Sequence, residues 1–73
     1  MIEREDVAAT ISELMVDYLA KLDASTALVQ DKCSAAEFQA YRRAVGRIMG
    51  TMVLEVMNPL YERHPRLKPQ EMD

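Results

Sequence analysis

The chain has 73 residues, of which 49% are apolar, with one cysteine, one histidine and a formal net charge of −3 at pH 7. These counts exclude an internal disulfide and leave a structural zinc ion without a Cys/His ligand set. Because a single core in a domain this small yields only about 3 to 5 kcal/mol, oligomerisation or very good helix packing is needed as well.

The N-terminal segment, Met1 to Asp6, is acidic, whereas a secretory signal peptide begins basic and continues apolar. The longest weakly polar run, Ile48 to Leu54, is far shorter than the roughly 20 residues that cross a bilayer. The sequence therefore predicts a cytoplasmic protein with no membrane partner.

The first predicted element is a long helix from about residue 4 to about residue 30. Its apolar residues recur at intervals of three and four, which places them on one stripe of an α-helix. They are Val7, Ile11, Leu14, Met15, Tyr18 and Leu22. Since no glycine or proline interrupts the stripe before Gln30, one continuous helix is favoured over a break between Asp23 and Ser25.

The second predicted helix runs from about residue 35 to about residue 57, after a turn over 31–34. Ser34 and Glu37 have the spacing of a capping box, in which each side chain bonds the other residue's amide. Pro59 lacks an amide donor, so the chain either kinks there or starts a short helix over about 59–63 with Asn58 as its cap. Pro65 then predicts an extended, mobile tail over 64–73, which either docks on a partner or folds back.

Two glycines, Gly46 and Gly50, lie four residues apart on one side of the second helix. Each costs about 1 kcal/mol relative to alanine in a helix interior, so something is expected to pack closely against them. On a regular helical wheel they lie beside Met57 and widen the apolar face to about 200°, more than one neighbouring helix covers. The residues predicted for this second interface are Gly46, Gly50, Met49, Val53, Met57, Met15 and Leu19.

The short connection makes the two helices antiparallel neighbours of similar length. Folding the chain between Lys32 and Cys33 sets Tyr41 opposite residues 24–27 and sets the glycines near Met15 and Leu19. A contact within the hairpin would thus explain the glycines, and a contact across a dimer is the alternative. A lone hairpin cannot cover both sides of its stripes, but two copies related by a twofold axis form a four-helix bundle. The predicted fold is all-α, a single hairpin domain over 1–73 that forms a homodimer.

Charge differs between the two halves of the chain. Residues 1–31 hold seven acids and two bases, a balance of −5, and residues 32–73 hold seven bases and five acids, a balance of +2. An acidic helix beside a more basic one is the simplest interpretation. Arg42, Arg43 and Arg47 form a candidate basic patch, but three arginines on a chain of pI about 5.0 make a poor footprint for nucleic acid.

No residue pattern predicts catalysis, a cofactor or a metal site. His64 precedes a proline and has no serine, cysteine or aspartate nearby in sequence, so we expect a solvated side chain. Cys33 lies in the turn after Lys32, where an inert thiol is favoured over a redox-sensitive or intersubunit one.

The function predicted from these features is that of a non-enzymatic interaction module. It would be a homodimeric adaptor or regulator that binds an unidentified protein through its helices. Two alternatives stay open. One is a carrier of small apolar ligands with a bundle cavity lined by methionine and glycine. The other, with weaker support, is a nucleic-acid-binding regulator that uses the basic patch.

Overall fold

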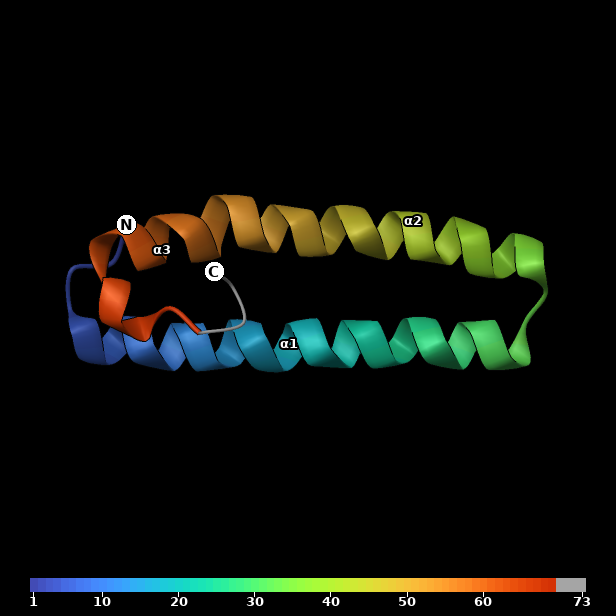
Figure 1. Ribbon diagram of the computed structural model, residues 1–73, viewed down its shortest axis with the longest axis horizontal. Helices are drawn as coiled ribbons and strands as arrows, with labels where there is room; N and C mark the ends of the chain where they lie inside the picture. The colour runs from blue at the N-terminus through green and yellow to red at the C-terminus, as the bar shows by residue number, and fades with distance from the viewer. Residues whose placement is uncertain (70–73) are drawn as a thin grey trace.

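The computed structural model describes residues 1–69, which form two long antiparallel helices side by side (Figure 1). α1 spans Glu5–Lys32 and α2 spans Ala35–Thr51. A π-helical segment, Met52–Met57, joins α2 to α3, Asn58–Arg63, and a 3-10 turn follows at Pro65–Leu67. The predicted all-helical hairpin is confirmed, with no strand anywhere in the described range.

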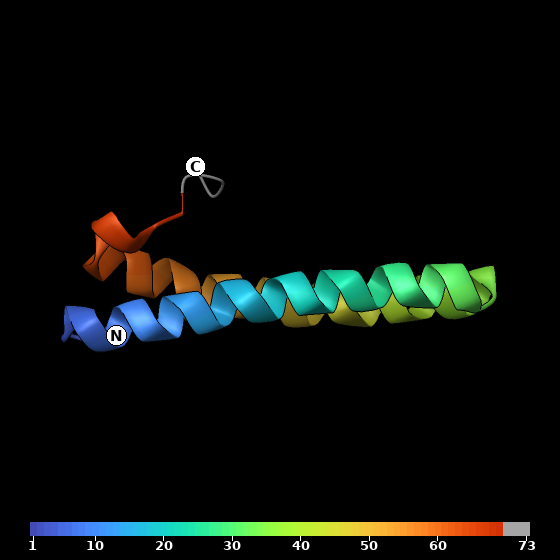
Figure 2. The same ribbon diagram turned by 90° about the horizontal axis from the view of Figure 1, so that it is seen from below.

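The hairpin is a single layer of helices. Its extents are 44 × 20 × 16 Å, and the C-terminal segment lies on one side of the layer that α1 and α2 form (Figure 2). Within residues 1–69, no helix combines the length and the apolar character that crossing a membrane requires. Each helix therefore has only one neighbour along most of its length.

α1 is one uninterrupted helix, so the alternative of a break between Asp23 and Ser25 is wrong. Its most buried positions are Ala8 and Ser12. The predicted stripe is only partly correct, because Val7, Leu14 and Tyr18 are exposed. The rest of the hairpin covers a face of α1 that is rotated away from these three residues. The buried residues on that face are small, Ala8 and Ser12, and such residues do not stand out in an apolar pattern.

The capping box at the start of α2 is confirmed. The Ser34 hydroxyl accepts a hydrogen bond from the amide of Glu37 at 3.1 Å, and the Ser34 amide donates to Glu37 Oε1 at 3.1 Å. Hydrogen bonds from the backbone and hydroxyl of Ser34 lower the pKa of the Glu37 carboxyl. Two amides that the helix cannot satisfy are thereby bonded, which fixes where α2 begins.

Replacing Ser34 by alanine is expected to lower the free energy of unfolding by about 1 kcal/mol, because the amide of Glu37 loses its acceptor. Glycine at the same position should cost only a few tenths of a kcal/mol, roughly, since water then reaches the amide. Urea denaturation of both variants measures the difference. An alanine variant as stable as the parent would show that the cap contributes nothing.

Pro59 does not end the second helix. The amide of Asn58 bonds the carbonyl of Val53, five residues back, and Asn58 has helical torsions of φ −61° and ψ −49°. In a regular α-helix the Pro59 ring would press on the carbonyl of Glu55, and the wider π turn before it relieves this clash. The alternative in which Asn58 caps a separate short helix is therefore wrong, because the helix continues through this residue.

The core lies at the open end of the hairpin, where α3 packs on the first half of α1 (Figure 1). Ala8, Met57 and Leu60 are wholly buried there, and Tyr61 is nearly so. The Tyr61 hydroxyl and Ser12 Oγ are hydrogen-bonded at 2.5 Å. Each of these two buried hydroxyl groups therefore has a hydrogen-bond partner inside the core.

The prediction of a solvated His64 is wrong. The residue is only 9% exposed, and its Nε2–H group donates a hydrogen bond to the carbonyl oxygen of Ile2, with Nε2 and the oxygen 2.6 Å apart. This bond joins the segment that precedes α1 to the residue that follows α3, at the open end of the hairpin.

Residues 64–69 fold back on the hairpin, which is one of the two predicted alternatives, but the predicted extended conformation is wrong because Pro65–Leu67 form a 3-10 turn. Leu67 packs against the core, and Arg66 forms two hydrogen bonds with the carboxylate of Glu5. The Arg66 guanidinium lowers the pKa of Glu5, so this pairing holds above the ordinary carboxyl pKa and is lost as pH falls through the lowered value. The rest of the predicted tail, residues 70–73, lies outside the described residues.

Candidate functional site

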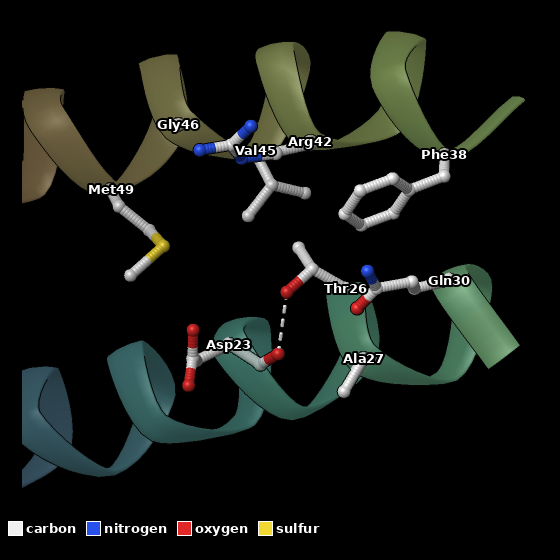
Figure 3. A pocket seen from close by; sticks show the side chains of 9 residues that line it. All are labelled: Asp23, Thr26, Ala27, Gln30, Phe38, Arg42, Val45, Gly46 and Met49. Carbon is white, nitrogen blue, oxygen red and sulfur yellow. Dashed lines mark hydrogen bonds between the residues drawn. The ribbon is translucent and has the colours of Figure 1, made fainter. Parts of the chain in front are cut away.

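Two grooves run between α1 and α2, one on each side of the hairpin. The first, called the glycine groove, has a volume of about 400 Å³ and is lined by Asp23, Thr26, Ala27, Gln30, Phe38, Arg42, Val45, Gly46 and Met49 (Figure 3). The second, called the tyrosine groove, has a volume of about 360 Å³ and is lined by Tyr18, Lys21, Leu22, Ser25, Tyr41, Ile48 and Met52.

The glycine groove mixes polar and apolar side chains. Phe38, Val45 and Met49 extend from α2 toward α1 (Figure 3). Asp23 and Arg42 bring charges to the same lining. Pockets for small apolar ligands are mainly hydrophobic and enclose most of the ligand, so this groove gives little support to the ligand-carrier alternative.

The two glycines make no close contact with other parts of residues 1–69. A Cβ atom built on Gly46 or Gly50 would meet no heavy atom within 4 Å. Neither residue has a positive φ, so the backbone does not require glycine at either position. The hypothesis that packing within the hairpin explains the glycines is therefore wrong.

Replacing both glycines by alanine is expected to raise the free energy of unfolding by about 0.5 to 1 kcal/mol per site, because alanine loses less backbone entropy in a helix. Urea denaturation gives the stability, and sedimentation equilibrium gives the self-association. The two single variants separate the contributions. A double variant that is more stable but no longer self-associates would assign the glycines to a contact between subunits.

The residues predicted for the second interface do not share one open surface. Met57 is wholly buried, and Met15, Leu19 and Val53 pack around the same core. The cause is the π turn, whose additional residue rotates the following positions by about 100° relative to a regular wheel. Met57, which the wheel places beside the glycines, thereby turns toward α1.

The tyrosine groove is the apolar surface that the hairpin leaves uncovered. Tyr18 is 47% exposed and Ile48 is 51% exposed at its centre. The Tyr41 hydroxyl donates to Ser25 Oγ at 2.8 Å, and Ser25 Oγ donates to the Leu22 carbonyl at 2.6 Å. These polar atoms are bonded to one another, so the groove presents mainly carbon to a partner.

The rim of the tyrosine groove is charged. Lys21 Nζ lies 5.7 Å from the centre of the Tyr18 ring and 3.0 Å from a carboxylate oxygen of Asp17. An apolar centre with a charged rim is the usual anatomy of a protein interface. Tyr18 and Leu22 of this groove belong to the predicted apolar stripe of the first helix, but the sequence assigned that stripe to the inside of the hairpin.

The three arginines of the basic patch are exposed and form no side-chain hydrogen bond or ion pair with residues 1–69. Arg42 and Arg43 line a shallow hollow of about 220 Å³ beside Gly46. Elsewhere, Cys33 is exposed in the turn, and the described part of the chain holds no group of three or more metal-ligating side chains.

Comparisons with known protein families, with curated proteins and with solved structures found no match to this chain. The two grooves and the charges around them are therefore the features that indicate a function.

Proposed function

We propose that the protein is a non-enzymatic helical interaction module of the cytoplasm, which works as a homodimer and binds other proteins as an adaptor or regulator. The observation that carries the proposal is the row of exposed apolar side chains along one side of a single-layer hairpin. Continuous apolar surface rimmed by charge is characteristic of protein-binding surfaces.

The exposed area supports a partner of substantial size. The chain exposes 5364 Å², whereas a compact monomer of 8.3 kDa is expected to expose about 4600 Å². The excess of about 800 Å² equals the area that each partner buries in an interface of standard size. A second copy supplies such an area without requiring another gene product.

Sedimentation equilibrium of the purified protein at micromolar concentration tests the homodimer. The expected mass is twice the chain mass of 8.3 kDa. A folded monomer, with the helical circular dichroism of the hairpin, would overturn the proposal.

Arg42, Arg43 and Arg47 form no ion pair within residues 1–69, and they favour one second candidate, a regulator that binds nucleic acid through them. Binding of this kind weakens steeply with salt, because cations are released from the phosphates. A titration of RNA and DNA oligonucleotides at two salt concentrations decides the matter. Absent or salt-independent binding would remove this candidate and leave the protein-binding function.

A further inference from the structure

We infer that two copies stack through their tyrosine grooves, with α1 of each copy over α2 of the other and both interhelical turns at the same end. This inference rests on the proposed homodimer and adds the surface and the orientation. Two independent observations carry it: the side of the hairpin that its own C-terminal segment covers, and the opposite charges of α1 and α2.

The two sides of the hairpin are not equivalent. α3 and residues 64–69 lie on one side of α1 and α2 only (Figure 2). They reach α1 at Ser12 and Glu5. Helical periodicity places Val7, Leu14 and Tyr18 on the opposite side of α1, where these exposed residues form a surface along the helix. The tyrosine side is therefore free to receive a partner as long as the hairpin itself.

The register within the hairpin shows what would meet across such a dimer. Ser25 is level with Tyr41, since their hydroxyls are hydrogen-bonded. Tyr18 and Ile48 each lie seven residues, about two turns of helix, further from the loop that joins α1 to α2. They are therefore level with each other, and both line the groove. When α1 lies over the partner's α2 with the turns together, each Tyr18 meets the partner's Ile48. The two most exposed apolar side chains of the groove then cover each other twice.

Two twofold arrangements would stack these surfaces, one with the interhelical turns at the same end and one with them at opposite ends. The charges of the helices favour the first. α1 carries six acids and two bases, a net charge of −4, whereas α2 carries three arginines and one acid, a net charge of +2. Turns at the same end set each acidic helix on a basic one. Turns at opposite ends would set α1 on α1 and α2 on α2. The charges act through the helices as wholes, because Asp23 and Arg42 line the glycine groove on the other side and Glu5 is paired with Arg66. Stacked helices are about 8 to 10 Å apart, close to the screening length at physiological salt, so the difference in net charge still favours this orientation.

Cys33 provides a direct test of the orientation, because it is exposed in the turn and is the chain's only cysteine. A nitroxide label on Cys33 in the otherwise unchanged protein allows double electron–electron resonance to measure the distance between the two turns. Turns at the same end should give a distance below about 30 Å, given helix layers about 10 Å apart and two flexible label arms. Turns at opposite ends would lie about 44 Å apart, the length of the hairpin.

The surface is tested separately with Ile48→Glu, which should weaken self-association at least 100-fold by placing a carboxylate in the apolar contact. Gln39→Glu is the matched control, because it adds the same charge to the same helix beside Gly46 and should leave the dimer intact. Circular dichroism reports whether each variant is helical. The label distance, measured without either substitution, does not depend on how these variants fold.

The outcomes separate this inference from the proposed function. A monomer in sedimentation equilibrium would overturn both. A dimer whose turns are about 44 Å apart would overturn the orientation alone. A helical Ile48→Glu variant that dimerises as tightly as Gln39→Glu would overturn the surface. A dimer with a short label distance that Ile48→Glu dissociates is the expected result.

Discussion

Replacement of Leu60 by alanine is expected to lower the free energy of unfolding by about 2 to 5 kcal/mol. Leu60 is wholly buried in α3, where it packs with Ala8, Met57 and Tyr61. Its truncation removes apolar contacts and leaves a cavity in a core with few other members. Because the whole chain is expected to be stable by only a few kcal/mol, the variant should be largely unfolded at 25 °C.

Leu54→Ala is the matched control for this prediction. It makes the same substitution six residues earlier, on a side chain that is 68% exposed. Changes at such surface positions are usually within about 0.5 kcal/mol. Urea denaturation followed by circular dichroism measures both variants. Equal losses from Leu54→Ala and Leu60→Ala would mean that α3 is not packed on α1.

Ending the chain after Arg63 is expected to lower the free energy of unfolding by about 2 kcal/mol. The truncation removes the buried bond from His64 to Ile2, worth about 1 kcal/mol, and the partly buried Leu67, worth about 1 kcal/mol more. It also removes the ion pair of Arg66 with Glu5, which is exposed to solvent and contributes little.

A chain that ends at Pro69 is the control, because it keeps each of these contacts. Thermal melting of the two truncated proteins gives the comparison. If the shorter chain melts at the same temperature as the longer one but loses binding to a protein partner, the segment after Arg63 serves docking and not stability. Loss of stability with unchanged partner binding would support a structural role.

The elements that local signals specify were predictable from the sequence. The repeating stripe from Val7 to Leu22 gives α1, and the pair Ser34 and Glu37 gives the start of α2. These signals act over three or four residues, so no knowledge of the tertiary structure is needed to recognise them. The short link between the helices then leaves the antiparallel hairpin as the simple arrangement.

The open end of the hairpin was not predictable in the same way. A helical wheel assumes 100° per residue, and the π turn breaks this assumption just before Met57. His64 is polar, so an apolar pattern does not predict its burial. It is buried with its ring N–H hydrogen-bonded to the carbonyl oxygen of Ile2, which is 62 residues away in the sequence. Both features depend on packing between distant segments.

The candidate site was found only in part. Gly46 and Gly50 predict a second contact surface on α2, and nothing within residues 1–69 packs closely against them. Tyr18 and Ile48 lie in the stripes and were assigned to the core, whereas about half of each side chain is exposed. The width of an apolar arc can be derived from a sequence. Which part of the arc the neighbouring helix covers depends on the tilt and rotation of the two helices.

The π turn also affects how the chain tolerates changes in length. Loss of one residue from the middle of α2 would turn everything after it by about 100° and carry Met57 and Leu60 away from α1. Loss of one residue from Met52–Met57, such as the exposed Leu54, would instead allow regular α-helical winding with the same side chains still facing α1. A natural relative one residue shorter between Thr51 and Asn58 would thus keep the same core, so a single-codon deletion is best tolerated at this point of the helix.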